Sequence, residues 1–361
     1  MGRKRSPWAG RAGTGATKHR RGATKTRNAA ATWRAAELRM QTSISRRSLL
    51  AACSLWPLAT HALPTPTLGE WTDPARQRRL PWLLRLPDAD RGDGPWPCVV
   101  YSHGLGGTRE GGARWGEAWA AGGIAVLHVQ HAGSDLPVLR GGLQALRAAA
   151  SAEQLVARTG DMQFALGEIA RRAEAGEAPW SRLRRGALGL AGHSFGAVTT
   201  QALAGERFPY GRAVAEPRPR AFIAFSPSPP PGGRSVQDAF GGITRPFLAV
   251  TGSEDGDPFG SYRKGDPRAA VYDGLPPGAR ALLWLDGADH GTCGGGRPPG
   301  LSSRTLQPRS RLTLQREPAH QALAARLSTL WWQAWLAGDE AARAGLRSPE
   351  GLGPGDRWRF D

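Results

Sequence analysis

The stretch GALGLAGHSFGAVTTQALAG, residues 186–205, decides the fold of this chain. Its apolar run 187–191 is typical of a buried strand, and the small residues after Gly196 favour a helix. Between them stands Ser194, with a glycine two positions away on each side. A Cβ at 192 or 196 is expected to strike the neighbouring strand or helix, so glycine is required there. The stretch therefore predicts a strand, a sharp turn at the serine and a helix.

Length and charge narrow the class of protein. A chain of 361 residues can bury a full core as one large domain or two small ones. The net charge of +18 is uneven: residues 1–62 hold 13 of the 48 Lys and Arg and a single acid, Glu37. The remaining chain has 35 basic against 29 acidic residues, with no basic cluster interleaved with aromatic residues. This distribution argues against nucleic-acid binding by the folded part.

The cysteines and the apolar runs exclude two further classes. Cys53, Cys98 and Cys293 show no C-x-x-C spacing and are too few for a disulfide framework. We expect Cys98 and Cys293 to be free thiols. No uncharged run of about 18 residues is also continuously apolar, as a membrane span requires, so no integral membrane association is predicted.

The N-terminal region reads as a basic extension followed by an export signal. Residues 1–39 are rich in Ala, Gly and Thr and have few large aliphatic residues, which predicts disorder. From Met40 onward, SRRSLL at 45–50 precedes a short apolar segment and a small-residue end, as in a twin-arginine (Tat) signal cut after about Ala62. Residues 40–62 are therefore interpreted as this signal, which implies recognition by the Tat machinery and a periplasmic or secreted protein. Met40 is then a candidate true start.

Two alternatives remain open for the N-terminal region. The segment 40–62 could be an amphipathic first helix of the folded protein. Alternatively, LAAC at 50–53 could be a lipoprotein processing site, although the apolar run after Arg47 is short for one.

The folded part, residues 63–338, alternates expected strands with helical patterns. Strands are expected at 76–86, 98–101, 124–129, 187–191, 221–225, 247–251 and 281–285. Pro81 indicates that the first of these is an edge strand or irregular. Helices are expected at 143–156, 161–171 and 318–337, the last stopping at Gly338. Residues 64–72 read as a linker and 339–361 as a C-terminal tail.

This alternation predicts an α/β protein with a mostly parallel central sheet and helices on both faces. In such sheets ligands bind outside the carboxyl ends of the strands. The glycine-rich loop 104–107, Ser194, Asp255 and His290 each follow an expected strand directly. We therefore expect these four features to meet at one edge of the sheet.

The residue types at that edge indicate nucleophilic catalysis. A serine hydroxyl needs a base within hydrogen-bond reach, and histidine has a second nitrogen that a carboxylate can orient. The sequence predicts Ser194 as nucleophile, His290 as general base and acid, and Asp255 as the orienting acid. The backbone N–H groups of Leu105 and Phe195 are expected to form an oxyanion hole. The G-x-S-x-G pentapeptide alone is weak evidence in a chain with 49 glycines, so its flanks carry the prediction.

Other residues of the same types compete for these roles. Glu254 and Asp257 are alternatives for the acid, and Asp289 is expected to cap a loop. Besides His290, the histidines outside the N-terminal extension, the signal and the last helix are His103, His128, His131 and His193. His103 and His193 lie in turns where the backbone is expected to act, and His128 and His131 would point to opposite faces of a strand. No metal site and no cofactor are predicted.

At these residues the sequence resembles the α/β-hydrolase superfamily, and within it predicted dienelactone hydrolases and platelet-activating-factor-acetylhydrolase-like esterases. The shared stretches are SHGLG at 102–106, GHSFGA at 192–197, SPSPP at 226–230, TGSED at 251–255 and GADH at 287–290. The resemblance covers about 68–337. It implies the α/β-hydrolase fold and cofactor-free hydrolysis of esters or lactones, with Leu105 and Phe195 in the oxyanion hole.

The sequence departs from that family in two ways. In the acetylhydrolases proper the acid follows the strand after the nucleophile, a position held here by Ser226. The resemblance therefore moves the acid to Asp255, as in dienelactone hydrolases. Dienelactone hydrolase itself has a cysteine where this chain has Ser194.

The sequence thus predicts an exported serine hydrolase that acts on a small-molecule ester. A peptidase or acyltransferase with the same three residues is one alternative. A non-catalytic binding protein that has kept the fold is another.

Overall fold

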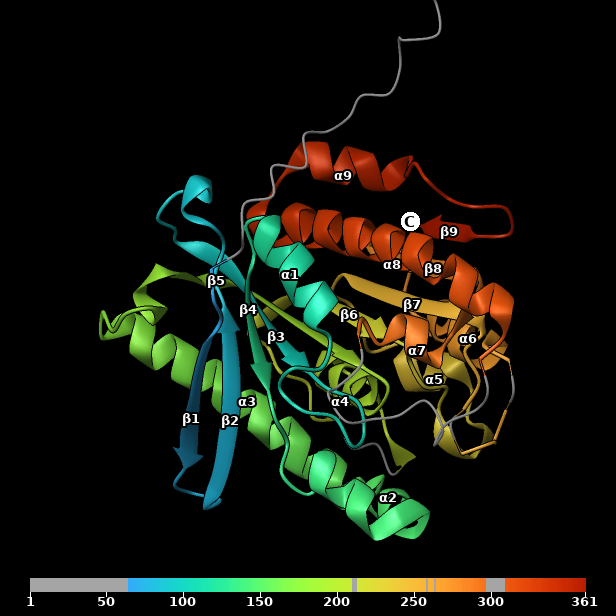
Figure 1. Ribbon diagram of the computed structural model, residues 1–361, viewed down its shortest axis with the longest axis horizontal. Helices are drawn as coiled ribbons and strands as arrows, with labels where there is room; N and C mark the ends of the chain where they lie inside the picture. The colour runs from blue at the N-terminus through green and yellow to red at the C-terminus, as the bar shows by residue number, and fades with distance from the viewer. Residues whose placement is uncertain (1–63, 210–212, 258, 263, 297–308) are drawn as a thin grey trace, which may run out of the picture. The chain divides into compact units, whose positions relative to one another are not determined.

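A twisted β-sheet forms the centre of the computed structural model (Figure 1). The structure describes residues 64–209, 213–257, 259–262, 264–296 and 309–361; the predicted extension 1–39 and the export signal 40–62 lie outside them. Within the described residues the sheet has nine strands in the order β1-β2-β4-β3-β5-β6-β7-β8-β9. The strands are β1 Thr67–Asp73, β2 Arg78–Arg85, β3 Trp96–Ser102, β4 Ala125–Val129, β5 Leu183–His193, β6 Pro219–Phe225, β7 Phe247–Glu254, β8 Arg280–Asp289 and β9 Arg357–Phe360.

The six central strands, β3 to β8, are parallel to one another, and the outer strands β1, β2 and β9 pair antiparallel with their neighbours. The α-helices are α1 Ala113–Ala121, α2 Gly142–Ala149, α3 Ala152–Glu174, α4 Phe195–Ala204, α5 Val236–Phe240, α6 Asp266–Gly274, α7 His290–Cys293, α8 Arg311–Trp332 and α9 Glu340–Arg347. Short turns of 3-10 helix are Ala89–Arg91, Leu136–Gly141, Trp180–Arg182 and Pro231–Gly233, and a π-turn spans Gln333–Ala337. This architecture confirms the predicted α/β class.

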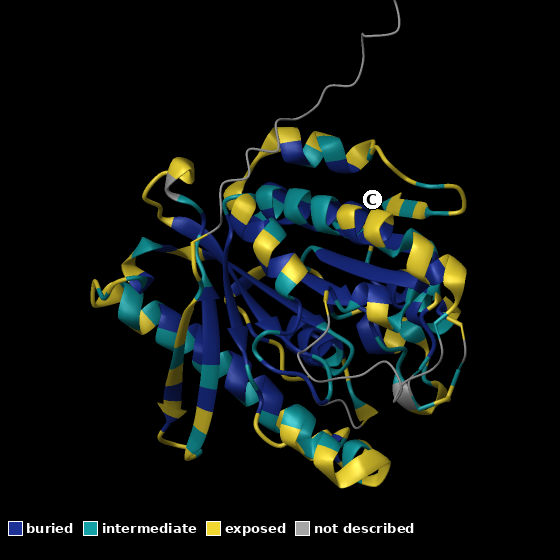
Figure 2. Ribbon diagram, viewed as in Figure 1, coloured by how far each residue is buried: buried dark blue, intermediate teal, exposed yellow. Residues whose placement is uncertain are grey.

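Two apolar clusters lie on the two faces of the sheet. On one face, buried side chains of α3, α4, α5 and α6 pack on the strands, and on the other those of α1, α8 and α9 do so. The central strands are mostly buried, apart from exposed residues such as 184–186 near the start of β5, whereas α2 is largely exposed (Figure 2). The expectation of helices on both faces is therefore confirmed.

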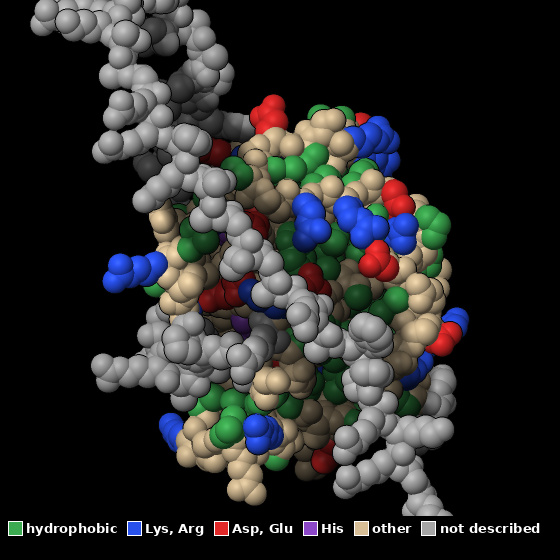
Figure 3. Space-filling view, turned by 90° about the vertical axis from the view of Figure 1, so that its right-hand side faces the viewer, with side chains coloured by type: hydrophobic (Ala, Val, Ile, Leu, Met, Phe, Trp, Pro, Cys, Tyr) green, Lys and Arg blue, Asp and Glu red, His purple; other side chains and the backbone are tan. Residues whose placement is uncertain are grey.

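The structure shows the state of two cysteines and the distribution of charge on the surface. Cys98 and Cys293 are free and buried, as expected. On the face drawn in Figure 3, basic and acidic side chains are interspersed. Arg359 and Asp273 form one exposed ion pair of the described surface. None of the described helices combines the length and the apolarity that a membrane crossing requires.

The ends of the sheet differ from the expectations. The predicted linker 64–72 contains all of β1 except its last residue. The alternating pattern of this strand buries only Trp71 and Asp73 and is therefore weakly apolar. The predicted tail 339–361 contains α9 and β9. In β9 the aromatic side chains pack inward while Arg357 and Arg359 stack on aromatic rings of the core. Because arginine occupies alternate positions of β9, the sequence of this strand resembles that of a polar tail.

Strand β2 is a paired strand, so Pro81 does not mark an edge. Pro81 pairs with Glu70 of β1, and the β2–β4 ladder begins one residue later, at Trp82. The carbonyl of Pro81 accepts the N–H of Gln130 at 2.9 Å. In an antiparallel strand the N and O of a residue face the same neighbour, so the missing N–H of Pro81 falls at the end of the ladder, where it is tolerated.

The three expected helices have different bounds in the structure, as α2, α3 and α8. The break that was expected between 156 and 161 lies instead at Ser151, whose side chain accepts the Gln154 N–H and caps α3. Helix α8 begins at Arg311 after a Ser310 cap, with Pro318 inside it. The predicted stop at Gly338 is confirmed, since this residue has φ 78° after the π-turn.

Candidate active site

Ser194 stands between β5 and α4, as predicted. Its backbone has φ 57° and ψ −116°, angles that a non-glycine residue adopts only under strain of about 1–3 kcal/mol. Its N–H donates to the Phe225 carbonyl of β6 at 3.0 Å, which holds the turn against the next strand. The sharp turn lifts the side chain of Ser194 out of the strand at the carboxyl end of the sheet.

The two glycines that flank the turn are required by close backbone contacts. A Cβ on Gly192 would lie 2.2 Å from the carbonyl oxygen of Gly196 in α4. A Cβ on Gly196 would lie 1.9 Å from the carbonyl oxygen of Ser102 in β3. The sequence-based expectation of a clash with the neighbouring helix and strand is confirmed at both positions.

The structure brings Ser194, His290 and Asp255 into one hydrogen-bonded row. His290 Nε2 lies 2.9 Å from Ser194 Oγ, and His290 Nδ1 lies 2.8 Å from Asp255 Oδ1. Asp255 follows β7, and His290 begins α7 directly after β8. Because Asp255 accepts at Nδ1, the imidazole carries its proton there and presents a lone pair to the serine hydroxyl. This is the geometry of a general base beside a nucleophile.

Asp255 is fully buried and is held as a carboxylate by its neighbours. Burial alone would raise the pKa of this carboxyl, but the charge of Arg268 and the hydrogen bond of His290 outweigh it and lower the pKa below the usual range. The other oxygen, Oδ2, accepts the hydroxyl of Thr251 at 2.8 Å. Both oxygens therefore have partners that fix the plane of the carboxylate.

Arg268 of α6 is a site residue that sequence reasoning missed. Its side chain is 2% exposed, and its Nε lies 3.1 Å from Asp255 Oδ1. The guanidinium also donates to the carbonyls of Asp255, Gly256, Ser226 and Pro227, at 2.8 to 3.1 Å. Arg268 thereby ties the loop after β7, which bears the carboxylate, to the loop after β6. Its spacing from Val271 and Tyr272, both buried, puts it on the inner face of α6.

The competing acids have other partners. Glu254 pairs with Lys264 on the surface at 2.5 Å. Asp257 accepts the N–H of Ser261 within its own loop. Asp289 accepts the N–H of Thr292 and so caps α7, as expected, and it also pairs with Arg309. Of the candidate acids, only Asp255 contacts His290 in the described structure.

The predicted oxyanion donors lie beside the serine. Phe195 is the first residue of α4, so its N–H has no acceptor within the helix. The glycine loop after β3 approaches closely: a Cβ on Gly104 would lie 3.3 Å from the Cβ of Ser194. Within the described residues, neither Leu105 nor Phe195 donates its backbone N–H to a protein acceptor. Both N–H groups are thus available to an oxygen near Ser194 Oγ.

The remaining histidines have local structural partners. His193 Nε2 lies 3.1 Å from the His290 carbonyl, and burial lowers its pKa to about 3. His128 Nδ1 contacts the Gly111 carbonyl, whereas His131 contacts Asp161, so the two point to different partners. In the described part of the chain no cluster of His, Cys, Asp and Glu could hold a metal ion.

A second row of serine, histidine and aspartate lies inside the protein. Ser102 Oγ is 3.0 Å from His131 Nε2, and His131 Nδ1 is 3.1 Å from Asp161 Oδ2. All three residues are at most 1% exposed, and Ser102 Oγ also accepts a hydrogen bond from Arg158 at 2.9 Å. A cation donating to the hydroxyl oxygen withdraws the electron pair that a nucleophile needs. Only the Ser194 row combines partial exposure with backbone donors that have no protein acceptor.

No protein-family model matches the chain, and no curated protein matches it either.

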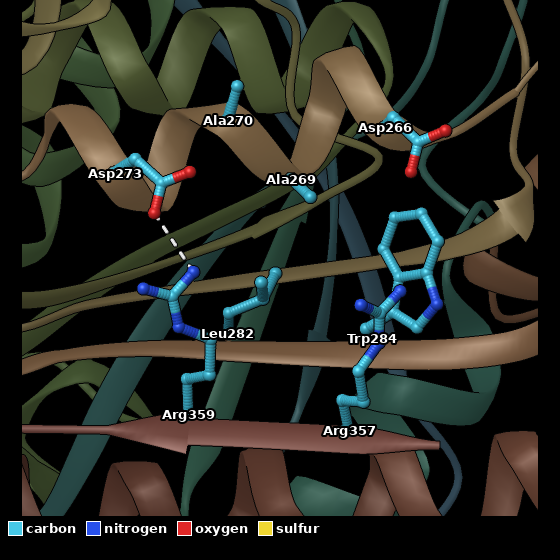
Figure 4. A pocket seen from close by; sticks show the side chains of 8 residues that line it. All are labelled: Asp266, Ala269, Ala270, Asp273, Leu282, Trp284, Arg357 and Arg359. Carbon is cyan, nitrogen blue, oxygen red and sulfur yellow. Dashed lines mark hydrogen bonds and ion pairs between the residues drawn. The ribbon is translucent and has the colours of Figure 1, made fainter. Parts of the chain in front are cut away.

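A separate hollow lies at the β9 edge of the sheet (Figure 4). It has a volume of about 240 Å³, and its walls are Asp266, Ala269, Ala270, Asp273, Leu282, Trp284, Arg357 and Arg359. Arg359 pairs with Asp273 at 2.9 Å, and Arg357 stacks on Trp284 with 4.7 Å between the guanidinium carbon and the ring centroid. None of these residues belongs to the Ser194 row.

Proposed function

We propose that this protein is a serine hydrolase of the α/β-hydrolase fold that cleaves carboxylic esters or lactones. The observation that carries the proposal is the 2.9 Å contact between His290 Nε2 and Ser194 Oγ. It is supported by the 2.8 Å contact of His290 Nδ1 with Asp255, by the strained turn at Ser194 and by the N–H groups of Leu105 and Phe195. The motifs shared with the esterase families agree with this assignment.

The proposed reaction begins with attack of Ser194 Oγ on the ester carbonyl carbon. The hydroxyl proton passes to His290 Nε2, and Asp255 stabilises the imidazolium that forms. The carbonyl electron pair moves to the oxygen, which accepts hydrogen bonds from the N–H groups of Leu105 and Phe195. When the tetrahedral intermediate collapses, the bond to the leaving alcohol breaks and His290 returns the proton to the alcohol oxygen.

The second half of the reaction releases the acid. Water attacks the Ser194 ester while His290 Nε2 takes its proton, and the same two N–H groups stabilise the second oxyanion. Collapse breaks the bond to Ser194 Oγ, and His290 Nε2 returns its proton to that oxygen, which restores the hydroxyl and releases the acid. For a lactone, the alcohol and acid are parts of one molecule, so ring opening gives a hydroxy acid.

A fluorophosphonate probe tests the assignment of the nucleophile. We expect the wild-type protein to be labelled and the Ser194→Ala variant to remain unlabelled. The variant Ser102→Ala is the matched control, because it removes the serine of the buried row. Absence of labelling in the wild type, or equal labelling of Ser194→Ala, would contradict the proposal.

The reaction class is tested with substrates. We expect turnover of p-nitrophenyl esters of increasing acyl length and little turnover of peptide amides. Preferential cleavage of amides, or transfer of the acyl group to an added alcohol in place of water, would instead assign a peptidase or an acyltransferase. Binding of an ester without release of acid or alcohol would identify a non-catalytic binding protein.

We also propose that the protein is exported by the Tat machinery to the periplasm or beyond. The support is the sequence of residues 40–62, with its arginine pair, short apolar segment and small-residue end.

A further inference from the structure

We propose that Arg158 and His103, both buried, are positioning residues that hold the two oxyanion donors in place. This inference rests on the proposed serine hydrolase and assigns two residues to its site beyond those named above. Neither residue contacts the Ser194 hydroxyl. Their role is to fix the peptide groups of the loop after β3 and the start of α4.

His103 fixes the peptide that carries the Leu105 N–H. The C=O of this peptide is that of Gly104, which accepts from His103 Nδ1 at 2.6 Å and from the Gly107 N–H at 3.0 Å. In a planar trans peptide the N–H and C=O point in opposite directions. Two donors on the Gly104 oxygen therefore hold the Leu105 N–H pointing the other way.

The tautomer of His103 follows from its two neighbours. His103 Nε2 is 3.0 Å from the N–H of His131, which can only donate, so Nε2 carries a lone pair and Nδ1 carries the proton. Burial, together with the charge of Arg158 and the proximity of His131, lowers the pKa of His103 well below its usual value. The ring is thus a neutral donor at Nδ1, which is the form that the Gly104 carbonyl requires.

Arg158 links the two halves of the oxyanion hole. It projects from α3 and is fully buried. Its guanidinium donates to the carbonyl of His103 and to Ser102 Oγ at the end of β3. It also donates to Thr199 Oγ1 of α4 at 3.0 Å and lies 4.7 Å from the centroid of the Phe195 ring. One rigid group thereby sets the separation between the glycine loop and the helix that begins with Phe195.

Arg158 also extends this support to a neighbouring loop. Its Nη1 donates to Ser134 Oγ at 2.9 Å, and the carbonyl of Ser134 accepts the N–H of Gly106 at 2.8 Å. A planar guanidinium with five donors suits such a site, since a lysine could not reach all these acceptors at once. Burial lowers the pKa of Arg158 to about 9, so it remains charged at neutral pH.

Kinetics of four variants test the proposal, with kcat calculated per active site titrated by the fluorophosphonate probe. Deleting an oxyanion donor costs roughly 10²–10³ in rate, so for misalignment in His103→Leu we expect a loss of about 10- to 100-fold in kcat with KM changing by less than about threefold. His103→Asn should recover part of this loss, because its amide nitrogen can donate from nearly the position of Nδ1. Arg158→Lys should lose kcat in the same way.

The matched control is His128→Leu. His128 is also fully buried and also contacts a backbone carbonyl, that of Gly111, but it does not touch the glycine loop 104–107. We expect its kcat to stay within about twofold of the wild-type value, because the donors are unaffected. Binding of a trifluoromethyl ketone, which forms an oxyanion on the serine, should weaken in His103→Leu and not in the control.

Nuclear magnetic resonance of the ring nitrogens gives a readout that needs no turnover. We expect His103 to be protonated at Nδ1 alone at pH 7. Protonation at Nε2, or a His103→Leu variant with wild-type kcat in an active wild-type background, would overturn the inference while leaving the serine hydrolase intact. An unreactive wild-type protein would instead overturn the proposed function, and this inference with it.

Discussion

Arg268 and His290 meet at a single oxygen atom of Asp255. Arg268 Nε lies 3.1 Å from Oδ1 and His290 Nδ1 lies 2.8 Å from the same atom. The carboxylate is completely buried, so the arginine is its permanent counter-ion and the imidazole is its directional partner. Because Arg268 is the counter-ion at this oxygen, we expect its removal to affect the buried carboxylate of Asp255 more than removal of any other side chain.

Replacing Arg268 by methionine should destabilise the protein by about 3–5 kcal/mol, because it leaves a buried carboxylate without its counter-ion. The pKa of Asp255 lies below its usual range in the wild type, so its stabilising effect is lost only as the pH falls through that low value. Without Arg268 the pKa rises and acid unfolding should begin at higher pH. Circular dichroism during urea and acid titrations measures both effects.

Lys264→Met is the control for Arg268→Met. Lys264 pairs with Glu254 on the same loop, but its side chain is 60% exposed, and exposed pairs contribute about 0–1 kcal/mol. An Arg268→Met protein as stable as Lys264→Met would contradict the role given to Arg268.

Introducing alanine at Gly196 should destabilise the protein by about 1–3 kcal/mol or more and abolish probe labelling, because the new methyl group would displace β3 from the turn. The contact to relieve is the 1.9 Å approach to the Ser102 carbonyl. Gly186→Ala in β5, the strand before the turn, is the control, since its nearest neighbour is the flexible end of Arg220 at 3.4 Å. Thermal melting and labelling of both variants check the prediction, which equal melting temperatures would refute.

Removing the hydroxyl of Ser102 should lower the free energy of unfolding by about 1–3 kcal/mol, because Arg158 and His131 each lose a buried partner. Labelling of Ser194 should persist. Urea unfolding and the fluorophosphonate probe measure the two outcomes. If Ser102→Ala folded normally but lost labelling while Ser194→Ala kept it, the nucleophile would be Ser102.

Glu206 should make the protein less stable as the pH rises. Burial raises its pKa from 4.5 to about 8, and Arg234 and Gln201 offset only part of this effect. Between these two values the folded protein holds a proton that the unfolded chain releases, so stability should fall by roughly 1.4 kcal/mol for each pH unit. Glu206→Gln should remove this slope in urea titrations at pH 5 and pH 8.

Glu216→Gln is the comparison for Glu206→Gln. Burial would raise the pKa of Glu216, but its hydrogen bonds with Arg218 outweigh burial and lower the pKa. This variant should therefore be destabilised at pH 8, whereas Glu206→Gln should be stabilised. The same sign for both variants would show that the protonation of Glu206 does not control the slope.

Changing Arg46 and Arg47 together to lysine should keep the protein in the cytoplasm, because Tat signals are read through their arginine pair. Cell fractionation and immunoblotting of the wild type and the double variant measure the effect. Changing Arg20 and Arg21, a second arginine pair upstream of Met40, serves as the control. Delivery of the double variant outside the cytoplasm at the wild-type level would exclude this signal.

The sequence predicted the parallel strands and the residues at their carboxyl ends, because these rest on local patterns. A buried strand reads as an apolar run, and the turn at Ser194 needs glycine at fixed positions. The outer strands β1 and β9 were missed because only one face of each packs against the protein, and in β9 that face is only partly buried. The polar residues that alternate along these strands make their sequences resemble a linker and a polar tail.

The buried arginines were missed for a different reason. Charged residues are almost never fully buried unless paired, so arginine in a helix suggests a solvated face. Yet Arg158 lies one turn before Met162, on the face of α3 that also carries the buried Leu166 and Ile169. An arginine on an apolar stripe is therefore the signal that could have been read. Its acceptors, in contrast, come from distant loops and are visible only in the fold.

The row of Ser102, His131 and Asp161 shows a difficulty in recognising active sites from side-chain geometry alone. A geometric template of hydroxyl, imidazole and carboxylate would match the described residues twice. One match is buried and has Arg158 donating to its hydroxyl oxygen. Template matching alone would therefore assign a reactive centre to a group that no reagent can touch. Access to solvent and a pair of vacant amide donors are the tests that tell the two apart.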